Sequence, residues 1–507
     1  MQSRLKVCLL ARYPPSEGGV SAGSYWLSRW LAEVGCEVNV ITNGTEAEIS
    51  ERLYVPTGDG FAQPTETSRH GAVRVFATGE PANLWRGYHP YANPFVTKIA
   101  ALATDVSDRY GCDFILANYL EPFGVAASLV ASWLDRPYAV QHAGSDVYRL
   151  ATSEDRRSGY RRVLDNASFI LGTPQIAAEW AATGINRSKF IPGMPPYVPS
   201  HLFRPSGPAL DALALLDEIS ETPFASPIAG YRHNDAVPTV GVYGKPGRRK
   251  GTFELVEAMI QLAAEGHEFN FLLMIGTGGT TAHAVARRFN EAGLSQRVAI
   301  LPFLVHWRVP EFIRACNVVC YLENSFSISA HRPMIPREVA MCGRALMLSA
   351  EVADYQRTRK PIAHGVNAIL VEDPTDILEL KRRLARLLGD PLLMSQIGSN
   401  AEDLYRHFDP VVWSEDLVAQ MTTAIEERSE GGTMSLYEFQ RICARLYTSQ
   451  QYRSSFESHG KATLGDTDLT DSELCSLLEI RDTLLPKLDR FARSLTAKKF
   501  IALWSKL

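Results

Sequence analysis

The stretch TVGVYGKPGRRKGTFELVEAM, residues 239–259, holds the pattern that decides the fold. Its opening, TVGVY, predicts a strand that is buried in a parallel sheet. Leu255, Ala258 and Met259 then lie on one face of a predicted helix. Between strand and helix, the loop GKPGRRKG carries four cations in eight positions. This order of strand, loop and helix predicts the start of a βαβ unit.

The same order of elements opens the chain. LKVCLLA at 5–11 is a continuous apolar run, Leu27, Trp30 and Leu31 share one helix face, and EVNVIT at 37–42 predicts the next strand. The two openings lie about 230 residues apart. They predict an α/β protein with two doubly wound, Rossmann-like domains that face each other across a cleft.

The composition is that of a globular protein with more than one core. At 507 residues the chain exceeds the size of one ordinary domain. Hydrophobic residues make up 46% and charged residues 21% of it, close to the globular average. The formal net charge is -4, and no basic face is visible in the composition. We therefore expect no binding of nucleic acid.

The cysteines and the first residues indicate a cytoplasmic protein. The start, MQSRLKVCLLAR, has an apolar run too short for the central region of a signal peptide or for a membrane span. The eight cysteines form no CxxC pair, and Cys316 and Cys320 are the most closely spaced. We expect buried reduced thiols, with neither disulfides nor a zinc site.

The basic loop is expected to bind an anion. Gly244, Gly247 and Gly251 leave room for close backbone approach. The N-terminus of the following helix favours anions by about 0.3–1 kcal/mol, and each charge-assisted hydrogen bond adds roughly 1.5–3 kcal/mol. A diphosphate suits this arrangement better than one carboxylate. The alternative is a solvated turn. The loop is not a P-loop, because the chain has no GxxxxGK[ST] sequence.

VYGKPGRRKGTFELVEAM resembles the GR...KG segment of the family 4 glycosyltransferases, which are retaining enzymes of the two-Rossmann GT-B type. Further motifs of that family follow in the expected order, over about residues 5–427. The family's Arg and Lys hold the donor diphosphate, and the resemblance places Lys245 and Lys250 at these two positions. Lysine keeps the charge of arginine but lacks its bidentate fork.

Two further segments resemble the family's nucleotide-binding motifs. LLMIGTGG at 272–279 is similar to its Gly-x-Gly turn near the nucleotide. NSFSISAHRPMIPREVAMCGRALMLS resembles the stretch in which two Glu residues lie eight positions apart. Glu338 matches the second, which contacts the ribose in the family. Ala330 stands at the position of the first, which helps to hold the transferred sugar, and His331 is beside it.

Two segments of the first half also resemble family motifs. YPPSEGGVSAG has GGxxxG spacing, which does not fit a dinucleotide fingerprint, and it resembles the family's N-terminal glycine loop, with Gly19 the best match. YAVQHAGSDVYRL resembles the family's HG.D element, widened by one residue. His142 stands where the family's His contacts the donor sugar, and Asp146 where an Asp orders the turn. The alternative for His142 is a structural role.

Together these resemblances imply a set of site residues and a division of the chain. The residues implied to be catalytic are His142, Lys245 and Lys250. Those implied to bind the donor are Gly19, Lys245, Lys250, Gly276, Gly278, His331 and Glu338. The predicted parts are an acceptor-side domain at 1–205, a linker and hinge at 206–236, a nucleotide-sugar domain at 237–405, a helix crossing back at 406–427 and a helical extension at 435–507.

The resemblance implies a retaining transferase that works without a metal ion or a cofactor, with a nucleoside-diphosphate sugar as co-substrate. The resemblance does not identify the acceptor, for which a glycan, a lipid-linked molecule, a small molecule and a peptide are the alternatives. TDSE at 470–473 is a capping box within the extension, which we expect to dock an acceptor or a partner. No transmembrane segment is expected, and peripheral attachment to a membrane is left open. The alternatives are a degenerate glycosyltransferase fold that only binds or scaffolds, which Ala330 favours, and a relative with different chemistry, such as an epimerase or phosphorylase.

Overall fold

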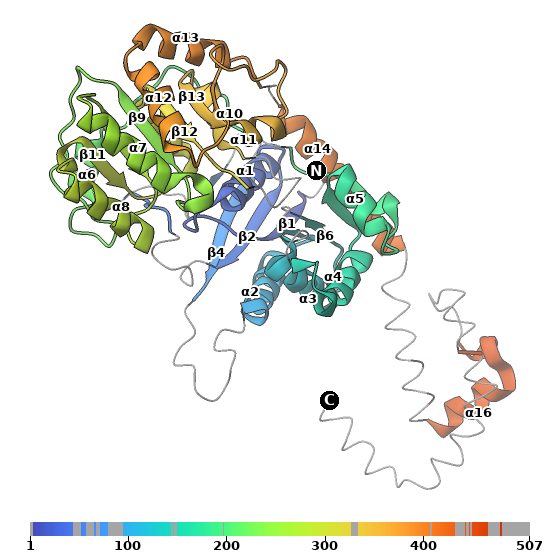
Figure 1. Ribbon diagram of the computed structural model, residues 1–507. Coiled ribbons are helices and arrows are strands. Elements are labelled where there is room, and N and C mark those ends of the chain that lie inside the picture. Colours follow the sequence, from blue (N-terminus) through green and yellow to red (C-terminus); the bar gives the residue numbers. More distant parts are fainter. Residues whose placement is uncertain are drawn as a thin grey trace. The chain divides into compact units, whose positions relative to one another are not determined.

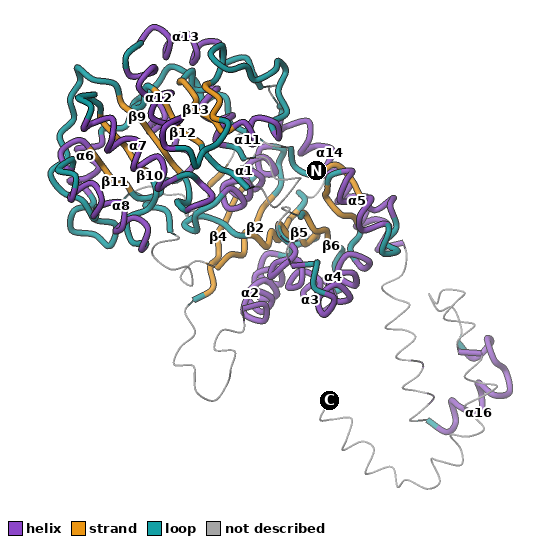
Figure 2. Tube along the Cα trace, viewed as in Figure 1, coloured by secondary structure: helices purple, strands orange, loops and turns teal. Residues whose placement is uncertain are grey.

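The computed structural model describes most of the chain and shows two parallel sheets, each covered by helices (Figures 1 and 2). The residues described are 4–43, 52–56, 65–66, 71–79, 95–142, 146, 150–195, 197–325, 333–405, 408–430, 442, 446, 449–464 and 477–478. The predicted class, two Rossmann-like domains with helical structure after them, is confirmed.

The first half of the chain forms an eight-stranded sheet in the order β3-β4-β2-β1-β5-β6-β7-β8. Neighbouring strands are parallel except β3 and β4. The strands are β1 Lys6–Ala11, β2 Glu37–Asn43, β3 Thr65–Glu66, β4 Ala72–Thr78, β5 Phe114–Asn118, β6 Tyr138–Gln141, β7 Phe169–Gly172 and β8 Phe190–Pro192. The helices are α1 Gly19–Glu33, α2 Phe95–Tyr110, α3 Val125–Leu134, α4 Glu154–Asn166 and α5 Pro174–Ala181, with short helical turns at Leu120–Gly124 and Arg187–Lys189.

The second half forms a six-stranded parallel sheet in the order β11-β10-β9-β12-β13-β14. Its strands are β9 Thr239–Tyr243, β10 Asn270–Met274, β11 Val298–Leu301, β12 Val318–Tyr321, β13 Ala345–Ser349 and β14 Ile369–Val371. Its helices are α6 Ala212–Glu218, α7 Thr252–Ala264, α8 Thr280–Glu291, α9 Val309–Arg314, α10 Ile335–Met341, α11 Ala350–Tyr355, α12 Ile377–Leu388 and α13 Pro391–Ala401. Short 3-10 turns lie at Arg248–Lys250, Ser295–Arg297 and His306–Arg308.

The stretch at 239–259 folds as the sequence predicts. It forms β9, a 3-10 turn and α7, whose Leu255, Ala258 and Met259 are buried against the sheet. Gly251 joins turn to helix at φ 63°, and a Cβ on it would lie 2.7 Å from the Cβ of Leu322. A side chain there would collide with the segment that follows β12, so this position requires glycine.

The two halves contact each other through segments far apart in the sequence. The backbone N–H of Tyr54 donates to the carbonyl of Phe303 at 2.7 Å. The ring of Tyr25 on α1 stacks on that of Trp307, with 4.4 Å between centroids. Both halves belong to one compact unit, Met1–Ala419. The contacts therefore hold α1, which Figure 1 shows on the side of the second half, against the loop after β11.

The segment predicted to be a linker packs on the second sheet. Leu210, Leu215 and Ile219 are buried in the same core as Leu272 and Leu301 of the sheet. It contains α6, which begins after Asp211, whose side chain accepts hydrogen bonds from two backbone N–H groups. The predicted domain limits and the hinge stay predictions.

The described cysteines confirm the prediction of buried reduced thiols. They are Cys8, Cys36, Cys112, Cys316, Cys320 and Cys342, all free and buried. Burial raises the pKa of the Cys320 thiol to about 12, so it stays protonated at neutral pH. The other two cysteines, Cys443 and Cys475, lie outside the described residues.

The second compact unit, Gln420–Leu507, is helical where it is described. Helix α14, Pro410–Glu430, runs into it, and α16, Gln450–His459, is followed by a 3-10 turn at Gly460–Thr463. Its apolar core includes Ile442, Leu446 and Phe456. The predicted capping box at 470–473 lies outside the described residues.

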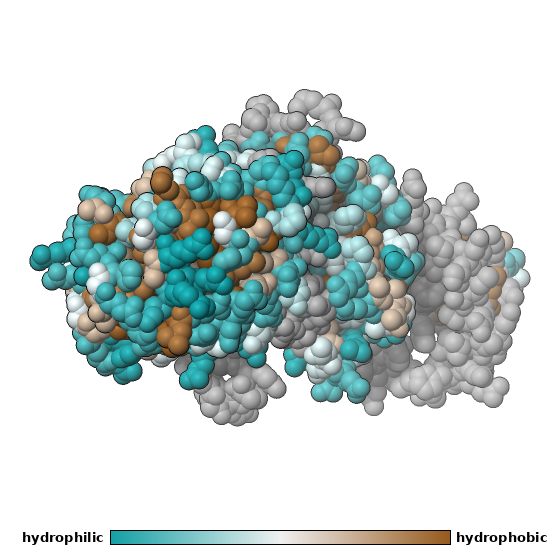
Figure 3. All heavy atoms as spheres, turned by 45° about the horizontal axis from the view of Figure 1, so that its top comes forward, coloured by the Kyte–Doolittle hydropathy of each residue, from teal (hydrophilic) through white to brown (hydrophobic). Residues whose placement is uncertain are grey.

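Within the described part of the chain, no helix is long and apolar enough to cross a membrane. The face in Figure 3 shows hydrophobic atoms among hydrophilic ones. The most exposed large apolar side chains of the second half are those of Leu378 and Leu392, at 66% and 75%. Single exposed apolar residues of this kind are normal on a protein surface.

Arg314 is a buried cation that anchors the chain where it enters the second half. Its guanidinium donates to the carbonyls of Pro208 at 2.7 Å and Leu202 at 3.0 Å. We expect Arg314→Ala to lower the free energy of unfolding by about 2–4 kcal/mol, because the buried side chain and the hydrogen bonds that its charged guanidinium donates are lost. Urea denaturation followed by tryptophan fluorescence measures this. Arg287→Ala, at a side chain that is 72% exposed, is the control. Equal effects of the two changes would contradict the anchoring role.

Candidate active site

The basic loop meets the glycine segment of the first half. Lys245 Nζ lies 3.2 Å from Oε2 of Glu17, which directly precedes Gly18 and Gly19. The Glu17 side chain is 12% exposed and that of Lys245 is 44% exposed. Gly18 has φ 126°, and a Cβ on Gly19, the first residue of α1, would contact nothing within 4 Å. The ion pair between Lys245 and Glu17 thus joins the basic loop to the segment that leads into α1, where Gly19 has free space around it.

The other lysine of the loop meets the exit of β12. Lys250 Nζ lies 2.5 Å from Oε1 of Glu323 and 5.7 Å from the centroid of the Tyr321 ring. The Tyr321 hydroxyl donates to the other oxygen of Glu323. Burial and then Glu323 raise the pKa of Tyr321 well above its usual value, so this hydroxyl stays protonated. Both lysines of the loop are therefore paired with carboxylates in this structure.

Glu338 lies within a hydrogen-bonded cluster. It belongs to α10, is 4% exposed, and each of its oxygens has a protein partner. The Tyr243 hydroxyl, at the end of β9, donates to Oε2 at 2.5 Å. His306 Nε2 lies 2.8 Å from Oε1. Since Tyr243 is the residue before the basic loop, the cluster and the loop share the exit of β9.

His142 follows β6 in the first half and is mostly buried. Its Nε2 accepts a hydrogen bond from the backbone N–H of Thr173 at 3.3 Å. Gly172 makes room for the ring, because a Cβ there would lie 3.2 Å from the imidazole. The Nδ1 atom is buried without a hydrogen-bond partner among the described residues. The neutral ring carries its proton on Nδ1, which is left as an unused donor.

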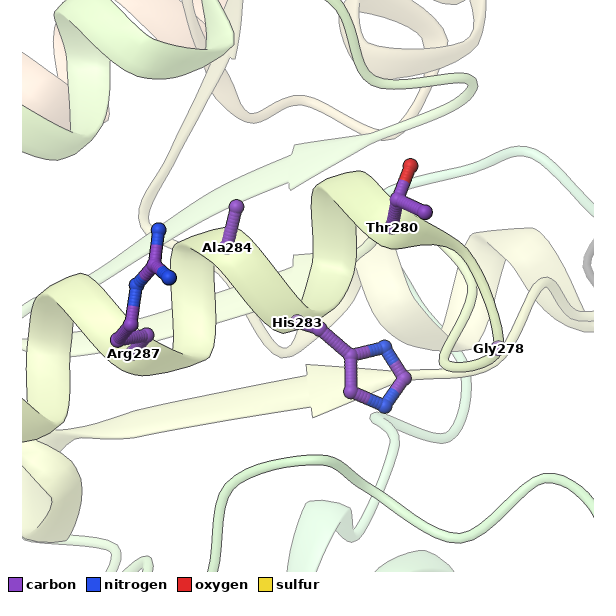
Figure 4. Close-up of a pocket in the computed structure, with 5 residues that line it drawn as sticks. All are labelled: Gly278, Thr280, His283, Ala284 and Arg287. Carbon is purple, nitrogen blue, oxygen red and sulfur yellow. The ribbon is translucent and has the colours of Figure 1, made fainter.

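The Gly-x-Gly turn lies at the end of β10. Gly276 has φ 78°, and a Cβ on it would lie 2.6 Å from the ring of Phe303, so the turn requires glycine. Gly278 lines a shallow depression of about 550 Å³ with Thr280 and Arg287. Figure 4 shows that its lining comes from this turn and from α8. The depression is separate from the contacts of Lys245 and Lys250 described above.

Some predicted positions lie outside the described residues. Ala330 and His331 belong to residues 326–332, which lie outside the described residues. Asp146 is described, fully buried, and accepts a hydrogen bond from the backbone N–H of Leu120 at 2.9 Å. No group of three or more His, Cys, Asp or Glu side chains that could hold a metal ion occurs among the residues that the structure describes.

Several residues at these contacts were missed by the sequence reasoning. Glu17 and Glu323 carry the only strong signal, an acidic residue beside a glycine pair and one directly after a strand. In the sequence, Tyr243 indicates only the end of a strand. His306 has no local signal, because its contact with Glu338 depends on packing between segments 32 residues apart.

Two family profiles match the two halves of the chain. The profile "Glycosyl transferase 4-like domain" matches residues 18–192, and "Glycosyl transferases group 1" matches residues 228–404. The chain belongs to the family 4 glycosyltransferases of the GT-B type. A curated relative, 2-deoxystreptamine glucosyltransferase from Streptomyces kanamyceticus, is 29% identical over 173 residues, 34% of this chain. The match spans only 42% of that relative's length.

Solved structures agree on the fold of this chain. Sucrose-phosphate synthase from Thermosynechococcus elongatus superimposes with a TM-score of 0.56 at 20% identity, covering 83% of this chain and 100% of that one. HepE from Anabaena, solved in complex with UDP and glucose, has a TM-score of 0.51 at 16% identity with the same coverage. At these identities the likeness establishes architecture alone. The roles of the site residues stay predictions.

The buried His142 gives a pH dependence of stability. Burial lowers its pKa below the ordinary value of 6.5, although Asp146 opposes this. The unfolded chain then binds a proton more readily than the folded one, so stability is lost as the pH falls through about 6.5 toward the folded pKa. We expect the His142→Gln variant to lose less stability than the wild type between pH 7.5 and 5.5.

Thermal unfolding of both proteins at the two pH values measures this difference. His283→Gln, at an exposed side chain, is the control. Equal losses of stability between the two pH values in the wild type and in His142→Gln would contradict a lowered pKa of His142.

Proposed function

We propose that the protein is a retaining glycosyltransferase that moves a sugar from a nucleoside-diphosphate sugar to an acceptor, with no metal ion and no further cofactor. The observation that supports this proposal is that both lysines of the basic loop form ion pairs with carboxylates. Lys245 meets Glu17 of the first half at 3.2 Å, and Lys250 meets Glu323 of the second at 2.5 Å. A diphosphate that displaced these carboxylates would be held by two cations at the junction of the halves.

In the proposed reaction the bond between the anomeric carbon and the diphosphate oxygen breaks. A bond from the acceptor oxygen to the same carbon forms on the same face of the sugar, and the acceptor's proton leaves with the diphosphate. Negative charge grows on the leaving diphosphate, where Lys245 and Lys250 are fixed cations that stabilise the transition state. His142 contributes its Nδ1–H, which has no hydrogen-bond partner among the described residues, as a donor to a sugar hydroxyl.

The remaining residues of the proposal bind the donor. Gly19 lets the diphosphate approach the start of α1, Gly276 and Gly278 contact the nucleotide, and Glu338 binds the ribose. His331 is included among the donor-binding residues from the family resemblance alone. The acceptor is a glycan, a lipid-linked molecule, a small molecule or a peptide. The extension at 435–507 is proposed to dock the acceptor or a partner, since its described part has an apolar core of its own.

A panel of nucleoside-diphosphate sugars tests the proposal directly. A ligand at 100 times its dissociation constant stabilises a protein by about 2.7 kcal/mol, which thermal unfolding detects. The ligand that stabilises the protein is then assayed for hydrolysis and transfer, and the anomeric configuration of the product is read by NMR. Binding without turnover would instead support a degenerate, non-catalytic binding subunit. Stabilisation by no member of the panel would refute both.

We expect Lys250→Ala to weaken donor binding at least tenfold and to leave the unfolding midpoint nearly unchanged. The Lys250 side chain is 32% exposed, so water reaches its ion pair with Glu323, and pairs that solvent screens contribute only about 0–1 kcal/mol to stability. Lys245→Ala should behave alike, and the double variant should lose less than the sum, because both cations face one diphosphate. Arg297→Ala, at a loop cation elsewhere in the second half, is the matched control. Unchanged kinetics in both lysine variants would refute the site assignment.

Activity should survive treatment with EDTA. The two lysines provide the positive charge that a metal ion would otherwise supply to the leaving group. The measurement is the turnover with the donor identified by the panel, before and after dialysis against EDTA. Complete loss that magnesium or manganese restores would show that the reaction requires a metal ion.

A further inference from the structure

A chain of three hydrogen bonds runs from the first half of the protein to Glu338. The indole Nε1–H of Trp26, on α1, donates to His306 Nδ1 at 2.9 Å. His306 Nε2 lies 2.8 Å from Glu338 Oε1, and the Tyr243 hydroxyl donates to Glu338 Oε2 at 2.5 Å. Trp26, Tyr243 and Glu338 are buried, at 9%, 7% and 4% exposure. One carboxylate of the second half is thus tied to a helix of the first.

The direction of each hydrogen bond follows from the chemistry of the donors. An indole nitrogen can only donate, so His306 Nδ1 accepts and carries no proton. The proton of the ring is therefore on Nε2, which donates to Glu338. Burial and then Glu338 raise the pKa of Tyr243 well above its usual value, so this hydroxyl also donates. Glu338 receives one hydrogen bond on each oxygen, which fixes the plane of its carboxylate.

A fixed carboxylate keeps part of its capacity to accept hydrogen bonds. Two oxygens offer about four acceptor positions, of which His306 and Tyr243 take two. The free positions suit two neighbouring hydroxyls, such as the diol of a ribose. Their orientation depends on His306, whose Nε2–H donates to Glu338 and whose Nδ1 accepts from the Trp26 N–H. Since Trp26 belongs to the first half, separating the halves would remove one of the two hydrogen bonds that fix the ring of His306.

We propose that His306 is a positioning residue that orients Glu338 toward the ribose diol of the donor, and that Trp26 couples this orientation to contact between the two halves. This inference rests on the proposed function. It assigns a role to two residues that no family motif marks. His306 does not touch the reacting atoms; it acts through Glu338.

A purely structural role for His306 is the competing explanation. The centroid of its ring lies 5.0 Å from that of Phe203 and 6.2 Å from that of Trp26 on α1. In that case a change at His306 would loosen the whole junction and weaken every ligand of the site alike. A positioning role affects only ligands that carry a ribose. Comparing a nucleoside diphosphate with inorganic pyrophosphate separates the two explanations.

Two substitutions of His306 dissect its two contacts. In His306→Asn, the side-chain amide extends about as far as Nδ1 of histidine, so it can still accept from Trp26 but cannot reach Glu338.

In His306→Gln, the side-chain amide extends about as far as Nε2 of histidine, so it can still donate to Glu338. Isothermal titration with UDP, GDP and ADP identifies the nucleoside diphosphate that the full-length wild type binds. This ligand and pyrophosphate are then titrated into both variants.

We expect His306→Asn to bind that nucleoside diphosphate about tenfold more weakly, because a hydrogen bond to a charged group is lost from the ribose site. Pyrophosphate binding should change less than about twofold, and His306→Gln should stay within about threefold of the wild type for both ligands. Trp26→Phe keeps an aromatic ring, smaller than the indole, but loses the N–H. It should weaken nucleotide binding in the wild type and have no further effect in His306→Gln, where the contact is already absent.

The outcomes are distinct. Equal weakening of nucleotide and pyrophosphate by His306→Asn would show a structural role and overturn the inference. Unchanged nucleotide binding in His306→Asn would also overturn it, while the proposed function would stand. A wild type that binds none of the three nucleoside diphosphates would refute the proposed function and this inference with it. If His306→Asn does not fold, Trp26→Phe with unchanged nucleotide binding would still overturn the coupling.

Discussion

The close packing of Gly251 against Leu322 is the constraint on which the site depends. A Cβ on Gly251 would lie 2.7 Å from that of Leu322, so only glycine lets the basic loop settle on the exit of β12. The backbone N–H of Asn324 then donates to the carbonyl of Arg249 at 2.8 Å. This contact places Lys250 beside Glu323 after the carboxyl end of β12, on the edge where ligands of parallel α/β sheets bind.

Charge and packing act together at the junction of the halves. The four cations of the loop would repel one another, and Glu17 and Glu323 offset this repulsion for Lys245 and Lys250 while no diphosphate is present. The uncharged contacts, such as the stack of Tyr25 on Trp307, hold α1 near the loop. In the proposed function, the two phosphates of the donor take the places of these two carboxylates. The ion pairs therefore neutralise Lys245 and Lys250, one carboxylate for each lysine.

Much of the fold could be predicted from the sequence, because it depends on local patterns. The apolar run at β1 and the helix face of Leu255 and Met259 follow periods that any buried strand or helix must show. The lysines of the basic loop could be found for the same reason, since charge and glycine stand together in the sequence. The hydrogen bond between His306 and Glu338 could not be predicted. His306 lies in the turn after β11 and Glu338 on α10, and these segments come together only in the folded domain, so periodicity contains no information on the pair. The pairing of Glu17 with Lys245 could not be predicted either, because it depends on the contact between the two halves.

The most direct test of the central claim is a crystal structure of the protein with the nucleoside diphosphate that it binds. The account predicts that the diphosphate lies within hydrogen-bond distance of Lys245 and Lys250, and that Glu17 no longer contacts Lys245. A diphosphate bound instead in the depression lined by Gly278 and Arg287, with the Lys245 and Glu17 ion pair intact, would contradict the account.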